Sequence, residues 1–286
     1  GTRKLKKIEL CLNYAGHCLA NKSDAIKGGL KQKVIFKSLW GIIKHPDKGF
    51  ILFDTGYTDR FYKETKFYPN KIYAKLTQVT IKKEDEIKSQ LNRHNIRVED
   101  IQHIIISHFH ADHIGGLRDF PNAIVYTTKS AFEQAIKIPN YRAFTKGILK
   151  GLLPDDIENR TVLIDEQSTP FQNDILGIKY DIFEDQSLYA VPLPGHAAGQ
   201  IGILLETEKR SYFLIADAVW LKKSYEDMIL PNSIVKLFFH NWSDFKVSLK
   251  KVHDFNQKYP DTIIIPTHCS ETTDLLVNKD FDFNVL

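Results

Sequence analysis

The sequence predicts an α/β fold in which two mixed β-sheets pack on each other and helices lie outside them. Two observations lead to this prediction. Residues 33–43 and 49–56 are strand-like and are joined by the turn sequence KHPDKG, which is typical of a hairpin. Further along the chain, apolar strand-like runs alternate with segments of helical periodicity, which is typical of sheets covered by helices.

The individual elements are predicted from their own patterns. Glu84–His94 has apolar residues at helical spacing, and a second helix is expected from Ser130, because Ser130 and Glu133 have the spacing of a capping box. A third helix is predicted over Ser243–Tyr259 and stops before Pro260. Strands are predicted from six apolar or β-branched runs, namely IQHIIIS, AIVYTT, LYAVPLPG, IGILLE, YFLIAD and TIIIPTH.

The chain of 286 residues is long enough for one large domain with a substantial core. No short repeat or low-complexity tract divides it. We predict a single domain over residues 1–286, with a short helical insertion around 138–160, where an amphipathic stretch is interrupted by Gly and Pro.

Composition argues against nucleic-acid and membrane partners. The net charge is +4, but the basic residues are scattered and acidic residues are interleaved with most of them. No apolar run reaches the roughly 18 residues that span a bilayer, and no signal peptide is visible. Three cysteines, an odd number, argue against a disulfide framework and favour a reducing, cytoplasmic location.

Three histidines and an aspartate follow one predicted strand within six positions. They are His108, His110, Asp112 and His113, and two glycines come next. In extended backbone, side chains at i and i+2 point to the same side, so His108 and His110 can converge on one point. Asp112 and His113 lie around the turn and can serve a second point. Such ligands suit zinc, and also iron, manganese or cobalt. The alternative is a set of surface-loop histidines.

Three more residues that can bind metal each follow an apolar, strand-like run. His196 follows LYAVPLPG, Asp217 closes YFLIAD and His268 follows TIIIPT. In α/β proteins, sites assemble where strands end. Considered alone, each histidine would be interpreted as a turn residue held by hydrogen bonds. The aspartate alone would be interpreted as a capping residue at the end of its strand. Taken together with the histidine cluster, the three complete two coordination shells.

The order and spacing of these residues resemble the metallo-β-lactamase superfamily. Its signature His-x-His-x-Asp-His stands at 108–113, and its later His, Asp and His match His196, Asp217 and His268. The sequence FDTG at Phe53–Gly56 is similar to the family's early strand-end motif. The resemblance covers roughly residues 33–270. It implies a four-layer αββα sandwich with a two-metal site at one edge of the sheets.

The resemblance also implies a role for each residue. Two divalent metal ions, expected to be zinc, would share Asp217 as a bridging ligand. Asp54 is either a residue that positions the histidine loop by hydrogen bonds or a turn-forming aspartate before Gly56. Each metal would have three further ligands, His108, His110 and His196 for the first and Asp112, His113 and His268 for the second.

Two such metals point to hydrolysis. They lower the pKa of a bridging water, so that hydroxide formed near neutral pH can attack a carbonyl or phosphorus centre while a metal polarises the substrate oxygen. Asp112 is the residue predicted to pass the proton to the leaving oxygen as a general acid. The expected activity is therefore metal-dependent hydrolysis of a small molecule.

Within the superfamily, the chain resembles the quorum-quenching N-acyl homoserine lactonases. Asp217 stands where zinc β-lactamases carry Cys, and His110 stands where diiron oxygen-reducing members carry Glu. Neither the longer C-terminal region of glyoxalase II-like thioesterases nor the nucleic-acid arm of the tRNA-processing branch is seen. The insertion at 138–160 and the spacing from Asp217 to His268 are similar to the lactonases. The expected reaction is opening of the lactone ring by the metal-bridging hydroxide.

Two positions depart from the lactonase pattern. Many of these enzymes place a Tyr three residues after the bridging Asp, where it hydrogen-bonds the substrate. Here that position is Trp220, whose indole N–H can still donate, so Trp220 joins Asp112 as a predicted catalytic residue. Ala111 stands where several lactonases have Phe. Both departures leave the substrate and its acyl-chain preference open.

Other functions stay open on the sequence alone. An organophosphate, aryl-ester or thioester hydrolase would use the same metals, and a mono-iron oxygenase acting on persulfides would keep similar ligands. A non-catalytic binding module is a further alternative, although the complete ligand set argues against it. The predicted partner is a small-molecule ester or lactone. The oligomeric state is left open, with a homodimer as one alternative.

The remaining histidines are expected to have mostly structural roles. His45 and His253 are predicted at the surface, and His103 in a core or edge position of its strand. His17 and His240 lie in loops that could line the pocket. The aromatic segments LFFHNW and RFYKETKFY could provide an apolar surface for an acyl chain, or could simply pack beneath a loop.

Overall fold

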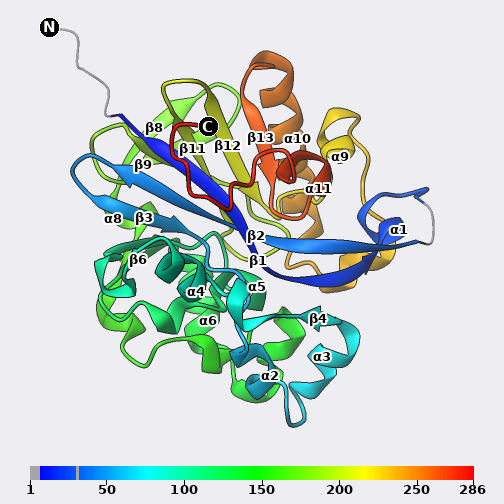
Figure 1. The fold of residues 1–286 in the computed structure, drawn as a ribbon. Coiled ribbons are helices and arrows are strands. Elements are labelled where there is room, and N and C mark those ends of the chain that lie inside the picture. The colour runs from blue at the N-terminus through cyan, green and yellow to red at the C-terminus, as the bar shows by residue number, and fades with distance from the viewer. Residues whose placement is uncertain (1–6, 30–31) are drawn as a thin grey trace, which may run out of the picture.

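Two mixed β-sheets form the centre of the fold, as the sequence predicts (Figure 1). The computed structural model describes residues 7–29 and 32–286. The first sheet contains β1 (Glu9–Asn21), β2 (Lys33–His45), β3 (Gly49–Phe53), β4 (Val79–Thr80), β5 (His103–Ile105), β6 (Ile124–Thr127) and β7 (Thr161–Leu163), in the order β4-β1-β2-β3-β5-β6-β7. The second contains β8 (Thr169–Asn173), β9 (Gly177–Asp181), β10 (Leu188–Pro192), β11 (Ile201–Glu206), β12 (Ser211–Ala216) and β13 (Ile263–Pro266), in the order β13-β12-β11-β10-β9-β8.

Strand direction brings several carboxyl ends to the same side of each sheet. In the first sheet, β3, β5, β6 and β7 run parallel, and β2 joins β3 through the predicted antiparallel hairpin. In the second sheet, β12 and β13 are parallel, and β10 points the same way because both β10 and β12 are antiparallel to β11. Side chains that follow these ends can therefore gather at one edge of the sandwich.

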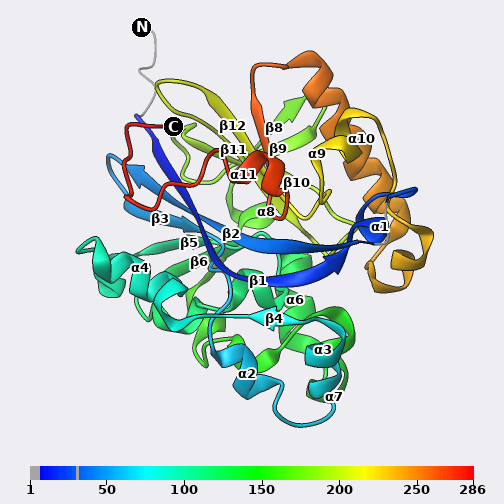
Figure 2. The same ribbon diagram turned by 45° about the vertical axis from the view of Figure 1, so that its right-hand side comes forward.

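Helices cover the outer face of each sheet (Figures 1 and 2). The α-helices are α1 (Lys22–Ala25), α2 (Arg60–Glu64), α3 (Lys71–Leu76), α4 (Ile87–Arg93), α5 (Ala111–Ile114), α6 (Lys129–Lys137), α7 (Asn140–Ala143), α8 (Ile164–Gln167), α9 (Lys222–Glu226), α10 (Trp242–Lys258) and α11 (Ser270–Thr273). The 3₁₀ helices are η1 (Lys83–Asp85), η2 (Val98–Asp100), η3 (Leu117–Asp119), η4 (Phe144–Lys146), η5 (Lys150–Leu152), η6 (Ile157–Arg160) and η7 (Ser233–Phe238).

The alternation of side chains along β12 shows how the layers are separated. Tyr212 and Leu214 point into the cluster between the two sheets, whereas Phe213 and Ile215 pack on the outer side. This is the two-residue period of a strand that is buried on both faces. The long helix α10 covers the outer side with Phe245, Leu249, Val252 and Phe255. Helices on both outer faces confirm the predicted αββα arrangement.

Residues 138–160 contain the short helices α7, η4, η5 and η6. The predicted start of α6 is wrong by two residues. Thr128, not Ser130, is its N-cap, and the Thr128 hydroxyl accepts a hydrogen bond from the backbone N–H of Ala131. Thr128 is the last residue in extended backbone before the helix, which is the conformation that an N-cap requires.

Two histidines that were expected at the surface are partly or fully buried. His45 is 2% exposed, and its Nε2 donates to Asp185 Oδ2 at 2.7 Å, while its Nδ1 accepts from backbone N–H groups of the hairpin turn. The turn folds under the β9–β10 loop, so the imidazole is enclosed. His253 is half-buried on α10, where its Nδ1 donates to the carbonyl of Tyr225 at 2.7 Å. His103 is half-buried in β5, an inner strand of the first sheet, and is hydrogen-bonded to the Tyr126 hydroxyl, so it has the expected structural role.

None of the helices in the described part of the chain is long and apolar enough to cross a membrane.

Candidate metal centre

The seven predicted ligands lie together where strands of both sheets end. The loop after β5 and the short helix α5 carry four of them, and the ends of β10, β12 and β13 carry the other three. Because the two sheets pack face to face, their strand ends meet across the edge of the sandwich. The ligands form two groups that share Asp217, namely His108, His110, His196 and Asp217, and Asp112, His113, Asp217 and His268.

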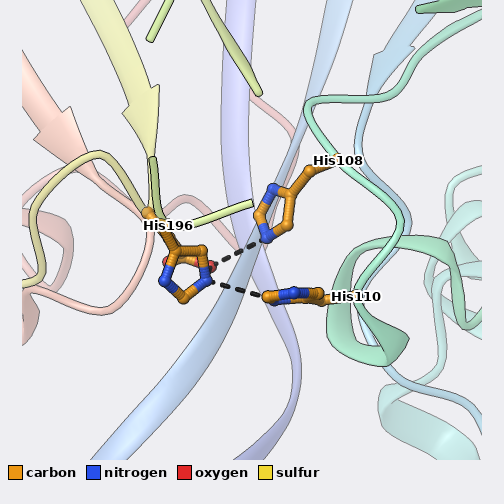
Figure 3. Close-up of side chains that lie close together, drawn as sticks. His108, His110 and His196 are labelled. Carbon is orange, nitrogen blue, oxygen red and sulfur yellow. Dashed lines mark hydrogen bonds and ion pairs between the residues drawn. The ribbon is translucent and has the colours of Figure 1, made fainter. Parts of the chain in front are cut away.

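The first group has three converging imidazoles (Figure 3). His196 Nε2 lies 3.1 Å from His110 Nδ1 and 3.4 Å from Asp217 Oδ2, and His108 Nε2 lies 3.2 Å from the same carboxylate oxygen. A tetrahedral zinc ion holds ligand atoms at about 2.0–2.1 Å, which separates them from one another by roughly 3.3 Å. The observed separations are those expected of atoms arranged around one small cation.

The second group has the same dimensions. His113 Nε2 lies 2.8 Å from Asp217 Oδ2 and 3.3 Å from Asp112 Oδ2. His268 Nε2 lies 3.0 Å from Asp112 Oδ2 and 3.3 Å from Asp217 Oδ1. Both carboxylates therefore face imidazole nitrogens, and Asp217 Oδ2 contacts histidines of both groups, whereas its Oδ1 contacts His268.

Hydrogen bonds at the opposite nitrogens orient three of these imidazoles, those of His108, His113 and His268. His113 Nδ1 donates to Asp54, and His268 Nδ1 donates to the carbonyl of Lys37. Ser107 Oγ donates to Asp54, so it accepts from His108 Nδ1. In the neutral form, each Nε2 then presents a lone pair to a carboxylate oxygen.

Two lone pairs at such distances repel unless a cation lies between them. Three buried atoms of the ligand residues make no hydrogen bond within the described part of the chain, and two of them, His108 Nε2 and Asp217 Oδ1, face other ligand atoms. The donor set, the distances and these unsatisfied atoms all fit divalent metal ions.

The charged groups of the centre control one another's protonation. Burial lowers the pKa of His113, but the carboxylates of Asp112, Asp54 and Asp217 outweigh it and hold that pKa well above its usual value. Burial raises the pKa of Asp217, but His268 and His113 hold it well below its usual value. Burial, followed by the charge of His113, lowers the pKa of His108 to about 3. Without metal, the centre thus holds an ionised Asp217, a protonated His113 and a neutral His108, and His113 must release its Nε2 proton before it can bind a metal ion.

Asp54 supports the histidine loop and does not coordinate. Its Oδ1 accepts from the backbone N–H of Ser107 at 2.8 Å, and its Oδ2 accepts from the Ser107 hydroxyl and from His113 Nδ1. The side chain is completely buried, and Asp54 has φ of 59°, a conformation that aspartate tolerates better than most residues. Of the two roles considered for Asp54, positioning of the histidine loop is the one that this geometry favours.

Several residues that hold the ligands were not found from the sequence. Gln200 is completely buried, its Oε1 accepts from the backbone N–H of Asp217 at 3.1 Å, and its Nε2 donates to the carbonyl of Leu193. Phe36 stacks on the His268 ring, with centroids 5.0 Å apart and planes 8° apart. Gln200 follows a glycine, and Phe36 lies in a strand. Neither sequence context indicates that the residue supports a metal ligand.

The insertion reaches the centre through Gly147. This residue has φ of 70° and ends η4, and a Cβ at its position would lie 2.9 Å from the His110 ring. Its carbonyl also accepts from the backbone N–H of Ala111 at 3.2 Å. The insertion therefore contacts a ligand of the first group directly, and only a residue without a side chain fits there.

Trp220 and Ala111, the two positions that depart from the lactonase pattern, differ in how deeply they are buried. Trp220 is half-buried, and its ring centroid lies 5.8 Å from that of His196 and 5.4 Å from that of Phe239. Ala111, in contrast, is completely buried in the core against the first sheet. Of the two loop histidines, His240 is exposed and its backbone N–H donates to the carbonyl of His196 at 3.4 Å, whereas His17 is half-buried in β1.

The family model for the metallo-beta-lactamase superfamily matches residues 36–268. The chain belongs to this superfamily. Curated relatives include an N-acyl homoserine lactonase of Bacillus cereus, 28% identical over 222 residues that cover 75% of this chain and 77% of the relative. An N-acyl homoserine lactonase from Rhizobium radiobacter is 26% identical over 166 residues, or 58% of this chain and 57% of the relative. These findings confirm the predicted family and the predicted class, a metal-dependent hydrolase.

Solved structures confirm the superfamily fold. An N-acyl homoserine lactone hydrolase with N-hexanoyl-L-homoserine at its catalytic metal centre has a TM-score of 0.71 and 22% identity, and the alignment covers 95% of this chain and 97% of that one. A dizinc quorum-quenching lactonase in complex with a product has a TM-score of 0.62 and 17% identity, with 93% and 89% covered. At these sequence identities, the similarity to the solved structures shows a shared fold and nothing more.

Proposed function

We propose that this chain is a dizinc hydrolase that opens the ring of N-acyl homoserine lactones. The observation that carries the proposal is the pair of ligand groups that share Asp217, one with three imidazoles and the other with two imidazoles and a second carboxylate. The names of the curated relatives support a lactone as substrate. Imidazole-rich sites of tetrahedral size support zinc.

In this proposal, His108, His110 and His196 would hold one ion, Asp112, His113 and His268 would hold the other, and both groups would share Asp217. Two divalent ions supply Lewis acidity and a water-derived nucleophile at neutral pH. The protein contributes rigidity, because Asp54, Ser107, Gln200 and the carbonyl of Lys37 fix the ligands before substrate arrives.

Asp112 is proposed to move the proton. Ring opening releases an alkoxide oxygen, which must be protonated as it leaves. Asp112 is 8% exposed and Asp217 only 2%, so the Asp112 carboxylate is the more accessible of the two. A carboxylate in this position can take a proton from the attacking nucleophile and release it to the leaving oxygen.

Trp220 is proposed to orient the substrate. Its ring lies beside His196 at the first ligand group. No described residue accepts a hydrogen bond from its indole N–H, so this donor is available to a substrate carbonyl. The neighbouring Phe239 ring adds an apolar wall that suits an acyl chain.

A substrate panel tests the proposal. The metal-replete protein is assayed with acyl homoserine lactones of short and long chains, a paraoxon-type phosphotriester, aryl esters and acyl thioesters, and its metals are identified by elemental analysis. We expect about two zinc ions per chain, from the two ligand groups, and the highest kcat/KM with a lactone. Lactones that turn over no faster than aryl esters would refute the lactonase assignment. Iron with oxygen uptake would instead indicate the oxygenase.

A further inference from the structure

One part of the surface combines exposed apolar side chains with unpaired cations. It consists of α2, the loop that follows, α3, and the neighbouring α7 and η4, and we call it the aromatic–lysine surface. Figure 2 shows α2, α3 and α7 together at the lower end of the molecule, and α3 contacts η4. Four large apolar side chains are strongly exposed there, Phe67 (73%), Tyr68 (61%), Leu76 (73%) and Tyr141 (69%).

The short helix α3 shows that this exposure is organised. Its Tyr73 and Ala74 face inward and pack against the core, whereas Lys71, Ile72, Lys75 and Leu76 are exposed. The exposed side of the helix thus presents two aliphatic side chains next to two lysines. Apolar side chains gathered in this way mark an interaction surface more often than single exposed residues do.

The charge of the aromatic–lysine surface is positive throughout. Its exposed cations are Lys63, Lys66, Lys71, Lys75, Arg142 and Lys146, and none of them forms an ion pair within the described part of the chain. The one acidic residue in 60–76, Glu64, is turned inward, with its carboxylate beside Gly151.

The lysines also lie over the exposed rings. Lys66 Nζ is 5.5 Å from the Phe67 centroid, and Lys71 and Lys75 are 5.6 and 5.1 Å from that of Tyr68. Cations and rings are therefore presented together on the same surface.

We propose that the aromatic–lysine surface docks this protein on an anionic lipid bilayer. Aromatic and aliphatic side chains bury in the headgroup–acyl boundary, while lysines around them are attracted to anionic headgroups. A second copy of the chain fits less well, because a two-fold contact would bring two sets of cations face to face. A single-stranded nucleic acid would use the rings and cations, but it would leave Ile72 and Leu76 without a role. This proposal revises the expectation that the chain has no membrane partner.

Docking would also place the metal centre beside the bilayer. The η4 segment ends at Gly147, which contacts His110, so this segment connects the aromatic–lysine surface to the first ligand group. Lipophilic acyl lactones partition into bilayers, and an enzyme held there meets them at a raised local concentration. This last step rests on the proposed function, whereas docking itself does not.

Vesicle binding tests the docking. The metal-loaded protein is sedimented with vesicles of phosphatidylcholine alone and of phosphatidylcholine mixed with phosphatidylglycerol. We expect binding to the anionic vesicles only, and weaker binding as salt is raised. The triple variant Lys66→Gln, Lys71→Gln, Lys75→Gln should bind at least about tenfold more weakly. The double variant Phe67→Ser, Leu76→Ser should also bind more weakly.

A matched control separates local from overall charge. The triple variant Lys44→Gln, Lys223→Gln, Lys246→Gln removes the same charge from exposed lysines elsewhere and should bind like the unmodified protein. Docking is overturned if the unmodified protein does not bind anionic vesicles, or if the control loses as much binding as the test variant. It is also overturned if the Phe67→Ser, Leu76→Ser change abolishes a dimer, or if a single-stranded oligonucleotide binds more tightly than the vesicles.

A second measurement separates docking from lactonase activity. Turnover of a short-chain, water-soluble lactone without vesicles reports on the proposed function alone. Anionic vesicles should raise the turnover of a long-chain lactone by the unmodified and control proteins, and not by the Lys66, Lys71, Lys75 variant. Binding without any lactone turnover would leave docking supported and refute the proposed function.

Discussion

His113 Nδ1 lies 2.7 Å from Asp54 Oδ2, and both side chains are completely buried. The carboxylate of Asp54 accepts three hydrogen bonds in total, two of them from Ser107. This contact joins the end of β3 to the histidine loop after β5, and it directs His113 Nε2 toward Asp112 and Asp217.

The Asp54→Asn variant should bind metal poorly. An amide has one oxygen and one NH2 group, so either His113 or Ser107 loses its acceptor. We expect metal affinity and kcat/KM to fall about 10- to 100-fold, as for other residues that orient metal ligands. Metal titration and steady-state kinetics measure the effect, with the exposed Asp261→Asn as control. Unchanged metal affinity would contradict the positioning role of Asp54.

Gly147→Ala should disturb the first ligand group. The new Cβ would approach the His110 ring to 2.9 Å, and a left-handed φ costs a non-glycine residue roughly 1–2 kcal/mol. Gly177→Ala is the matched control, because Gly177 has φ of 80° and no atom within 4 Å of the added Cβ. Both variants should lose stability, but only Gly147→Ala should lose metal. Equal metal content in the two would disprove the contact with His110.

Trp220→Phe should reduce kcat/KM for a lactone without reducing metal content. The ring packing beside His196 and Phe239 is kept, whereas the indole N–H is lost. A neutral hydrogen bond contributes about 0.5–1.5 kcal/mol, which corresponds to about a 2- to 12-fold loss. Trp220→Tyr, which restores a donor, should recover part of the activity. If Trp220→Phe has full activity, Trp220 does not hydrogen-bond the substrate.

Removal of metal should lower the melting temperature. Chelation leaves the buried carboxylates of Asp112 and Asp217 balanced only by protons on imidazoles such as that of His113. Added zinc should stabilise the folded state by about 4 kcal/mol at a free concentration a thousand times its Kd. Calcium at the same concentration should not, because it prefers oxygen ligands. His108→Ala should weaken the zinc effect, and a melting temperature that is insensitive to chelation would argue against metal binding.

His103 should make the protein less stable as pH falls. Burial, followed by the charges of Lys48 and His45, lowers the pKa of His103 from 6.5 to about 4 in the folded state. Between these two values the unfolded chain binds a proton that the folded chain does not, so stability is complete above pH 6.5 and decreases toward pH 4.

Melting temperatures across this pH range measure the effect of His103. The His103→Gln variant should show a smaller decrease than the unmodified protein, because it removes one group that takes up a proton on unfolding. The exposed His240→Gln serves as control and should follow the unmodified protein. Identical pH profiles for His103→Gln and the unmodified protein would refute this role.

The ligand set could be predicted because its residues are polar, able to bind metal and placed after apolar strands. His196, Asp217 and His268 each stand where an apolar run stops, which identifies them without any knowledge of their contacts. The supports of these ligands could not be predicted in the same way. The carbonyl of Lys37 accepts from His268, and a backbone acceptor has no residue signature.

The strands that the sequence did not indicate are those with a broken or weak apolar pattern. β1 has a register shift between Tyr14 and His17, which interrupts its alternation. The β8–β9 hairpin is mostly exposed or half-buried and has few of the apolar residues that mark a strand. The burial of His45 depends on a loop 140 positions away in the chain, so no local pattern predicts it.

Each ligand group takes residues from both sheets. His108 and His110 follow β5 of the first sheet, whereas His196 and Asp217 follow strands of the second. A partly folded chain can contain both sheets with their side chains still loosely packed. Such a chain would show normal secondary structure and yet hold little metal. Metal content is therefore a sensitive measure of the fraction of correctly packed protein in a preparation. It should be measured in each recombinant sample before activities are compared.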